Sequence, residues 1–147
     1  MKLPKQLQRF PDPMLLVTAD DQTAKFRLAG GDALEELDGV ALAPEMKSDS
    51  EGSFTSADGS RVAGPSSDRH DTPRKEKFSR QVAERIAMLI RERRAIGVRI
   101  AALPEILHRI EAHLPEDVKK KVHSRTEQDL MKMDEVEVVQ RLLEGRD

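Results

Sequence analysis

The sequence predicts an α/β fold: a mixed β-sheet with helices on its faces and a long loop before the first long helix. Two segments near the start, 14–19 and 23–28, have the apolar or alternating character of paired strands. The stretch 73–94 has apolar residues at helical spacing, and an apolar run at 97–103 follows it. Strands on both sides of a long helix imply a sheet with both parallel and antiparallel pairs.

Composition limits the classes of protein to which the chain can belong. Its 147 residues suit one domain with a sizeable core. Four Phe and no Tyr or Trp argue against a base-stacking platform for single-stranded nucleic acid, and the lack of Cys excludes disulfides and Cys-based sites. No stretch has the roughly 18 apolar residues of a membrane span, and no signal peptide is recognisable. We therefore expect a cytoplasmic protein without a membrane partner.

The first strand is expected to follow a lead-in segment. Residues 1–13 contain three prolines and lack a strand or helix pattern. The run 14–19 (MLLVTA) is apolar throughout, so it predicts a buried strand. Asp20, Asp21 and Gln22 then supply turn chemistry, which favours a hairpin over a cation site at the two aspartates.

The second and third strands are read from weaker patterns. Residues 23–28 alternate, with Ala24, Phe26 and Leu28 on one face and Lys25 and Arg27 on the other. This predicts a half-buried strand that pairs with the first. The stretch 33–43 fits neither period cleanly, and we interpret it as a third, antiparallel strand.

The long loop and the helix behind it dominate the middle of the chain. The stretch 44–72 is rich in Ser, Asp and Gly, and we expect it to be a long flexible loop. Thr72 is a candidate N-cap and Pro73 fits a first helical turn, so the helix is expected over 73–94. Its apolar stripe, which should be buried, consists of Phe78, Val82, Ile86, Leu89 and Ile90.

The remaining elements of the chain are expected to alternate between strand and helix. Residues 97–103 are expected to form a strand buried on both faces inside the sheet, and a second helix begins at Pro104, with Ile106, Leu107, Ile110 and Leu114 inward. A last strand is expected within 121–129. A final helix is expected over 133–143, with Val136, Val139, Leu142 and Leu143 on its apolar face.

Charge is unevenly distributed along the chain. The segment 69–99 contains ten Lys or Arg against four Asp or Glu, whereas the segments on either side are acidic. A basic helix behind a long polar loop has the charge of a footprint for phosphate groups, and a solvated helix face is the simpler alternative.

Four phrases of the sequence carry a family resemblance: LLVTADDQTAKFRL, GSFTSADGSR, DRHDTPRKEKFSRQVAERI and GVRIAALPEILHRIEAHLPEDVKKKV. Through them, nearly the whole chain resembles the bacterial host attachment proteins. That family is similar to the middle domain of archaeal and eukaryotic class I release factors and of the ribosome-rescue factor Pelota. The resemblance implies one domain over 1–147, with a strand, an exposed loop and a long helix as in the release-factor domain.

The sequence departs from the release factors at the point of their chemistry. Release factors carry Gly-Gly-Gln at the tip of this loop, whereas the loop here offers only Ala-Asp-Gly-Ser and Val-Ala-Gly-Pro. Peptidyl-tRNA hydrolysis by that mechanism is therefore not expected. We expect no catalytic residue, cofactor or metal.

The candidate binding residues lie in the loop and at the start of the helix. Basic side chains and a helix start both attract phosphate. The set is Arg61, Arg69, His70, Arg74, Lys75 and Arg80.

Three functions are weighed. The favoured one is a non-catalytic binding module that engages the ribosome, a tRNA or another RNA-associated partner, or a protein, through residues 44–72 and the basic helix. The first alternative is a hydrolase acting on RNA or a nucleotide ester, with His70 as base beside Asp68 or Asp71. The second is an intracellular factor whose loss impairs bacterial attachment to host cells. A solvated loop is the simpler interpretation of the Asp-His cluster.

Overall fold

The computed structural model describes residues 1–42 and 63–145, with side chains for all of these except 63–72. The elements follow in the expected strand and helix order, with two short additions, η1 and α3. They are η1 (Lys5–Leu7), β1 (Phe10–Ala19), β2 (Thr23–Gly31), β3 (Ala33–Ala41), α1 (Ala63–Arg93), β4 (Gly97–Ala101), α2 (Pro104–Ala112), α3 (Glu116–Lys119), β5 (Val122–Thr126) and α4 (Glu135–Glu144).

The five strands form one mixed sheet in the order β3-β2-β1-β4-β5. The β1–β2 and β2–β3 pairs are antiparallel, and the β1–β4 and β4–β5 pairs are parallel. The predicted α/β class is therefore confirmed. β4 has a partner on each side and is buried along most of its length, as its apolar run predicts, while β1 occupies the centre of the sheet.

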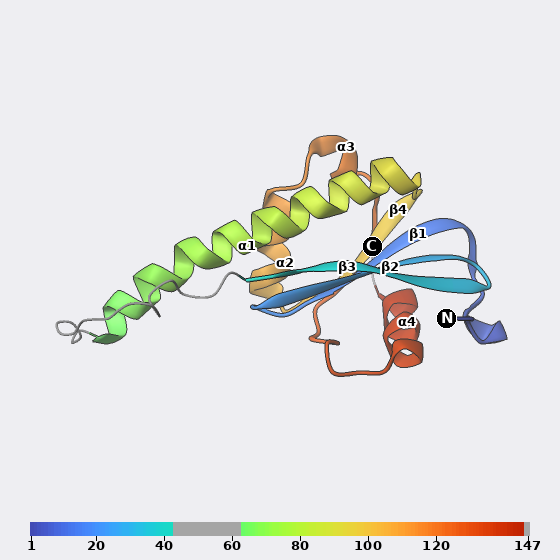
Figure 1. The fold of residues 1–147 in the computed structure, drawn as a ribbon, viewed down its shortest axis with the longest axis horizontal. Coiled ribbons are helices and arrows are strands. Elements are labelled where there is room, and N and C mark those ends of the chain that lie inside the picture. The colour runs from blue at the N-terminus through green and yellow to red at the C-terminus, as the bar shows by residue number, and fades with distance from the viewer. Residues whose placement is uncertain (43–62, 146–147) are drawn as a thin grey trace.

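Helices cover both faces of this sheet (Figure 1). α1 and α2 pack on one face, where their apolar residues join those of β1, β2 and β4 in the larger core. α4 and the N-terminal segment pack on the other face and form a second core. The α1 stripe is buried as expected, with Phe78, Val82 and Ile86 fully inaccessible to solvent.

The start of α1 differs from the sequence prediction. The helix begins at Ala63, so the last ten residues of the expected loop are helical and Pro73 lies inside the helix. Thr72 and Pro73 are therefore not the cap and first turn. Pro65 falls in the first turn instead, where the backbone N–H groups have no intrahelical partner to lose. A proline inside a helix removes one donor and its ring crowds the carbonyl four residues earlier, which is why the sequence favoured Pro73 as a helix start.

The expected lead-in segment is part of the fold. Leu3, Leu7 and Phe10 are at most 5% exposed and belong to the second core. Lys2 forms a bridge with Ala33, and β1 begins at Phe10 rather than at residue 14. The prolines had suggested irregular chain, yet Pro11 and Pro13 fall where the β1–β2 register is interrupted, between Phe10 and Met14.

Two side chains differ from their predicted environment because α4 covers the second sheet face. Arg27, assigned to the outer face of a half-buried strand, is only 2% exposed. In α4 itself Val136 is 36% exposed, and Val138 takes its place in the core beside Val139 and Leu142. Local alternation cannot show which remote helix packs over a strand.

Candidate functional site

The start of α1 lies outside the packed body of the protein. The helix has 31 residues, which corresponds to a length of about 46 Å. Figure 1 shows its N-terminal part extending beyond the ends of the strands. Among the described side chains of α1, the first buried one is Phe78, and those of 73–77 are exposed or half-buried. The helix is thus anchored from its middle onward.

A cavity of about 360 Å³ lies where the projecting helix leaves the body. Asp21, Gln22 and Thr23 from the β1–β2 turn line one side of it, and Arg74 and Lys75 line the other. The end of β3 completes the lining with Ala41 and Leu42. The fold therefore brings two of the predicted binding residues to the point from which the chain enters residues 43–62.

The β1–β2 turn that forms one wall is held by Asp20. Its Oδ1 accepts hydrogen bonds from the backbone N–H groups of Gln22 and Thr23, at 2.8 and 2.7 Å. This is the turn chemistry expected from the sequence. Asp21 is exposed and lines the cavity together with the two basic residues.

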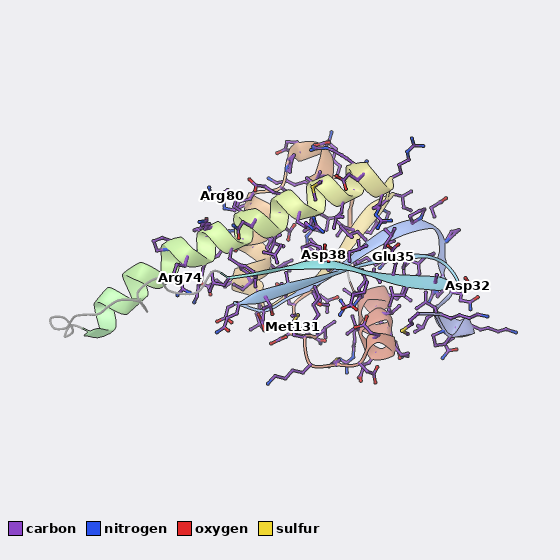
Figure 2. All side chains as sticks on the ribbon, in the orientation of Figure 1. Asp32, Glu35, Asp38, Arg74, Arg80 and Met131 are labelled. Carbon is purple, nitrogen blue, oxygen red and sulfur yellow. The ribbon has the colours of Figure 1, made fainter. Side chains whose placement is uncertain are left out.

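Arg80 occupies a different side of the helix. It is exposed, and Figure 2 shows it on the side of α1 away from the sheet, whereas Arg74 lies on the side toward β3. Lys77 is exposed as well. Arg74 and Arg80 therefore lie on different sides of α1 and do not form one flat patch.

Glu76, the acidic residue among these basic ones, is held by the body of the protein. Its Oε1 accepts a hydrogen bond from Arg109 Nη1 at 2.6 Å, and its Oε2 lies 2.9 Å from His113 Nε2. The hydrogen bond with His113, and then the positive charge of Arg109, lower the pKa of Glu76 below its ordinary value of 4.5. Its carboxylate is thus engaged by Arg109 of α2 and by His113, the residue after that helix.

Several predicted site residues fall outside this description. Arg61 is outside the described residues, and for Arg69 and His70 only the helical backbone of α1 is described. The same holds for Asp68 and Asp71, so the proposed catalytic cluster stays a prediction. Among the described side chains, no group of three His, Cys, Asp or Glu has the arrangement of a metal site.

Sequence reasoning missed the other wall of the cavity. Gln22, Thr23 and Leu42 approach Arg74 only because β1, β2 and β3 pair in this register. These residues carry no local motif beyond the turn.

None of the helices in the described part of the chain has both the length and the apolarity of a membrane span.

Comparisons with known proteins agree with the fold. A model of the family described as "Protein required for attachment to host cells" matches residues 14–142. No curated protein matches the sequence.

Two solved structures are similar at low sequence identity. The archaeal translation termination factor aRF1 has a TM-score of 0.52 and 15% identity, over 90% of this chain and 37% of its own. A chain described as "Archaeal protein" has a TM-score of 0.48 and 15% identity, over 95% of this chain and 38% of its own. This chain thus spans little more than a third of the length of either.

Proposed function

For this chain, which belongs to the family of proteins required for attachment to host cells, we propose the function of a non-catalytic binding module for an RNA-containing partner. The partner class is the ribosome or a tRNA. The contact surface consists of residues 44–72 and the basic start of α1, of which 44–62 lie outside the described residues.

The observation that carries this proposal is the projecting polar helix. Residues 63–77 contain no Val, Leu, Ile, Met or Phe, so this part of α1 offers no apolar face to a partner. A helix that is polar all round gains little from packing against a protein surface. Its partner must instead be recognised through charge and hydrogen bonds, as phosphate groups are.

The described part of that helix carries a surplus of basic residues at its start. Arg74, Lys75, Lys77 and Arg80 fall within seven residues, and Glu76 among them is engaged by Arg109 and His113. Such a group suits the phosphate backbone of RNA, whose contacts position a protein without reading sequence.

The fold similarity favours a partner in translation. The structure of aRF1 is that of a translation termination factor, and this chain matches part of it at the level of the fold. Termination chemistry is not part of the proposal, because no Gly-Gly-Gln occurs in the sequence. The one Gly-Gly pair, Gly30-Gly31, is followed by Asp32 and joins β2 to β3. If the chain acts in translation, the attachment phenotype of the family would be an indirect effect of that role.

The direct test is binding of the purified chain to tRNA and to ribosomes at increasing salt. Phosphate contacts release condensed counterions, so the affinity should fall steeply between about 50 and 200 mM salt. Absence of salt-dependent binding to either RNA would refute the proposal and leave a protein partner. RNA cleavage or ester hydrolysis by the chain would instead favour the hydrolase alternative.

A further inference from the structure

A second cavity, of about 630 Å³, lies at the carboxyl ends of β4 and β5. The chain after β4 continues into α2 on one face of the sheet, and the chain after β5 continues into α4 on the other face (Figure 1). Connections that leave toward opposite faces open a crevice at the strand ends, which is where open α/β sheets bind ligands. α2 and α4 supply the walls of this crevice, and β5 supplies its base.

The wall of this cavity contains a guanidinium group with unused donors. Arg125 Nε donates to Glu111 Oε1 at 2.7 Å, and the two side chains are 37% and 23% exposed. Within the described residues, the terminal Nη1 and Nη2 groups of Arg125 make no hydrogen bond. An arginine held along one edge by a carboxylate presents its other donors in fixed geometry, which suits an oxyanion.

A buried hydroxyl beside this arginine also lacks a partner. Thr126 lines the cavity and is 9% exposed, and its Oγ1 has no hydrogen-bond partner in the described part of the chain. Burying a hydroxyl without a partner costs roughly 1–3 kcal/mol. Gly145 packs directly against this hydroxyl, since a Cβ at position 145 would collide with Thr126 Oγ1. The hydroxyl oxygen is inaccessible to solvent, so Arg125 rather than Thr126 is the donor that a ligand in the cavity can reach.

The rim of the cavity has the opposite charge. Glu127 and Glu144 line it, are exposed, and make no ion pair within the described residues. Arg141, also at the rim, is bound only weakly, at 3.2 Å to Gln128 and 3.4 Å to Glu137. A ligand that is only anionic would meet the two carboxylates, whereas an attached cationic group would be attracted by them.

We propose that this crevice binds a small zwitterion, whose carboxylate or phosphate contacts Arg125 and whose ammonium group faces Glu127 and Glu144. The proposal concerns a site on β5, α2 and α4 and does not depend on RNA binding by α1. Both oxyanion classes share the same recognition chemistry, and the ligands of the test separate them.

The experiment titrates the purified full chain, labelled with ¹⁵N-arginine, with glycine and with O-phosphoethanolamine. Acetate and inorganic phosphate serve as ligands that carry the anion alone. The expected result is a saturable shift of the Arg125 Nε resonance with at least one zwitterion, at lower concentration than with its matching anion. No saturable shift with either zwitterion, or equal affinity for the matching anions, would overturn the proposal.

Variants locate the binding. Arg125→Lys keeps the charge but loses the fork, so it should weaken binding of the zwitterions by about tenfold or more. Glu144→Gln removes one carboxylate of the rim, so it should weaken binding of the zwitterions but not of acetate or inorganic phosphate. Arg93→Lys is the matched control, because Arg93 is 39% exposed and pairs with Glu35 at 2.8 Å on another surface. Equal weakening by Arg93→Lys, or none by both cavity variants, would also overturn it. Thermal unfolding of each variant shows that it is folded, and Arg125→Gln replaces Arg125→Lys if that variant is not.

Discussion

Arg27 of β2 and Glu135 of α4 form a bidentate ion pair across 108 residues of sequence, with N–O distances of 2.5 and 2.9 Å. The arginine is 2% exposed and also donates to Thr18 Oγ1 at 3.0 Å, so every described contact of its head group lies on the α4 face of the sheet. The first turn of α4 is thereby fixed against the centre of the sheet.

Loss of Glu135 should destabilise the fold. Glu135→Ala leaves a buried guanidinium with Thr18 as its remaining acceptor. Breaking a fully buried pair costs roughly 3–5 kcal/mol. Glu135 is 37% exposed, so water can replace part of the interaction and we expect about 2 kcal/mol. Urea unfolding measures this change. The control is Glu137→Ala, whose exposed pair with Arg141 at 3.4 Å should contribute less than about 0.5 kcal/mol. Equal losses of unfolding free energy in the two variants would contradict a specific stabilising role of the Arg27–Glu135 pair.

A glycine in β4 should not tolerate a side chain. A Cβ at Gly97 would collide with the His123 ring and would lie 2.6 Å from the Lys121 carbonyl oxygen. Gly97→Ala should therefore cost about 1–3 kcal/mol of unfolding free energy, because β4 and β5 must move apart. Gly30→Ala is the control, since its Cβ would lie 3.8 Å from the nearest atom, Pro13 Cα. Thermal unfolding of both variants checks the difference, and similar melting temperatures would contradict the close β4–β5 approach.

Acid should remove the contribution of Glu76 to stability. Folding lowers the pKa of this carboxyl from 4.5, chiefly through the hydrogen bond with His113, so the folded state favours its charged form. The contribution is complete above pH 4.5 and is lost as the pH falls through the lowered pKa of the folded state. Because Glu76 is 41% exposed, it should amount to less than about 1 kcal/mol.

The measurement for Glu76 compares urea unfolding of the wild type with Glu76→Gln across the acid range. The difference between the two proteins should be present at neutral pH and shrink below pH 4.5. Glu105→Gln provides the control, since Glu105 is 64% exposed and contacts Arg109 at 3.3 Å. A wild-type advantage over Glu76→Gln that grew on acidification would contradict the predicted sign.

Reversal of charge at the start of α1 should weaken RNA binding. The double variant Arg74→Glu and Lys75→Glu should lower affinity for tRNA or ribosomes and reduce the slope of log affinity against log salt by roughly one unit per lost phosphate contact. The matched control is Arg91→Glu with Arg94→Glu, which changes the net charge equally at the other end of the helix. The same loss in both double variants would indicate a general charge effect and count against a local site.

His70 separates the binding module from the hydrolase alternative. If the chain binds without chemistry, His70→Ala should change RNA affinity by less than about threefold, because the Lys and Arg side chains supply the charge that neutralises phosphates. Under the hydrolase alternative the same change would abolish turnover while binding persisted. Single-turnover assays with RNA and with ester substrates, run beside the binding measurement, distinguish the two results.

The order of strands and helices could be read from the sequence because periodicity records which side of an element is buried. The stripe from Phe78 to Ile90 is buried, and the apolar run of β4 lies inside the sheet. The basic character of residues 69–80 was equally visible, since charge is a property of the chain itself.

Only the tertiary structure decided which distant segments meet. Burial of Arg27 depends on α4 packing over β2, and the cavity beside Arg74 depends on the register of β1, β2 and β3. The start of α1 at Ala63 was missed because Pro65 and Pro73 can each occupy a first helical turn by local rules. Periodicity specifies the buried face of an element, whereas its partner is selected by packing summed over the whole chain.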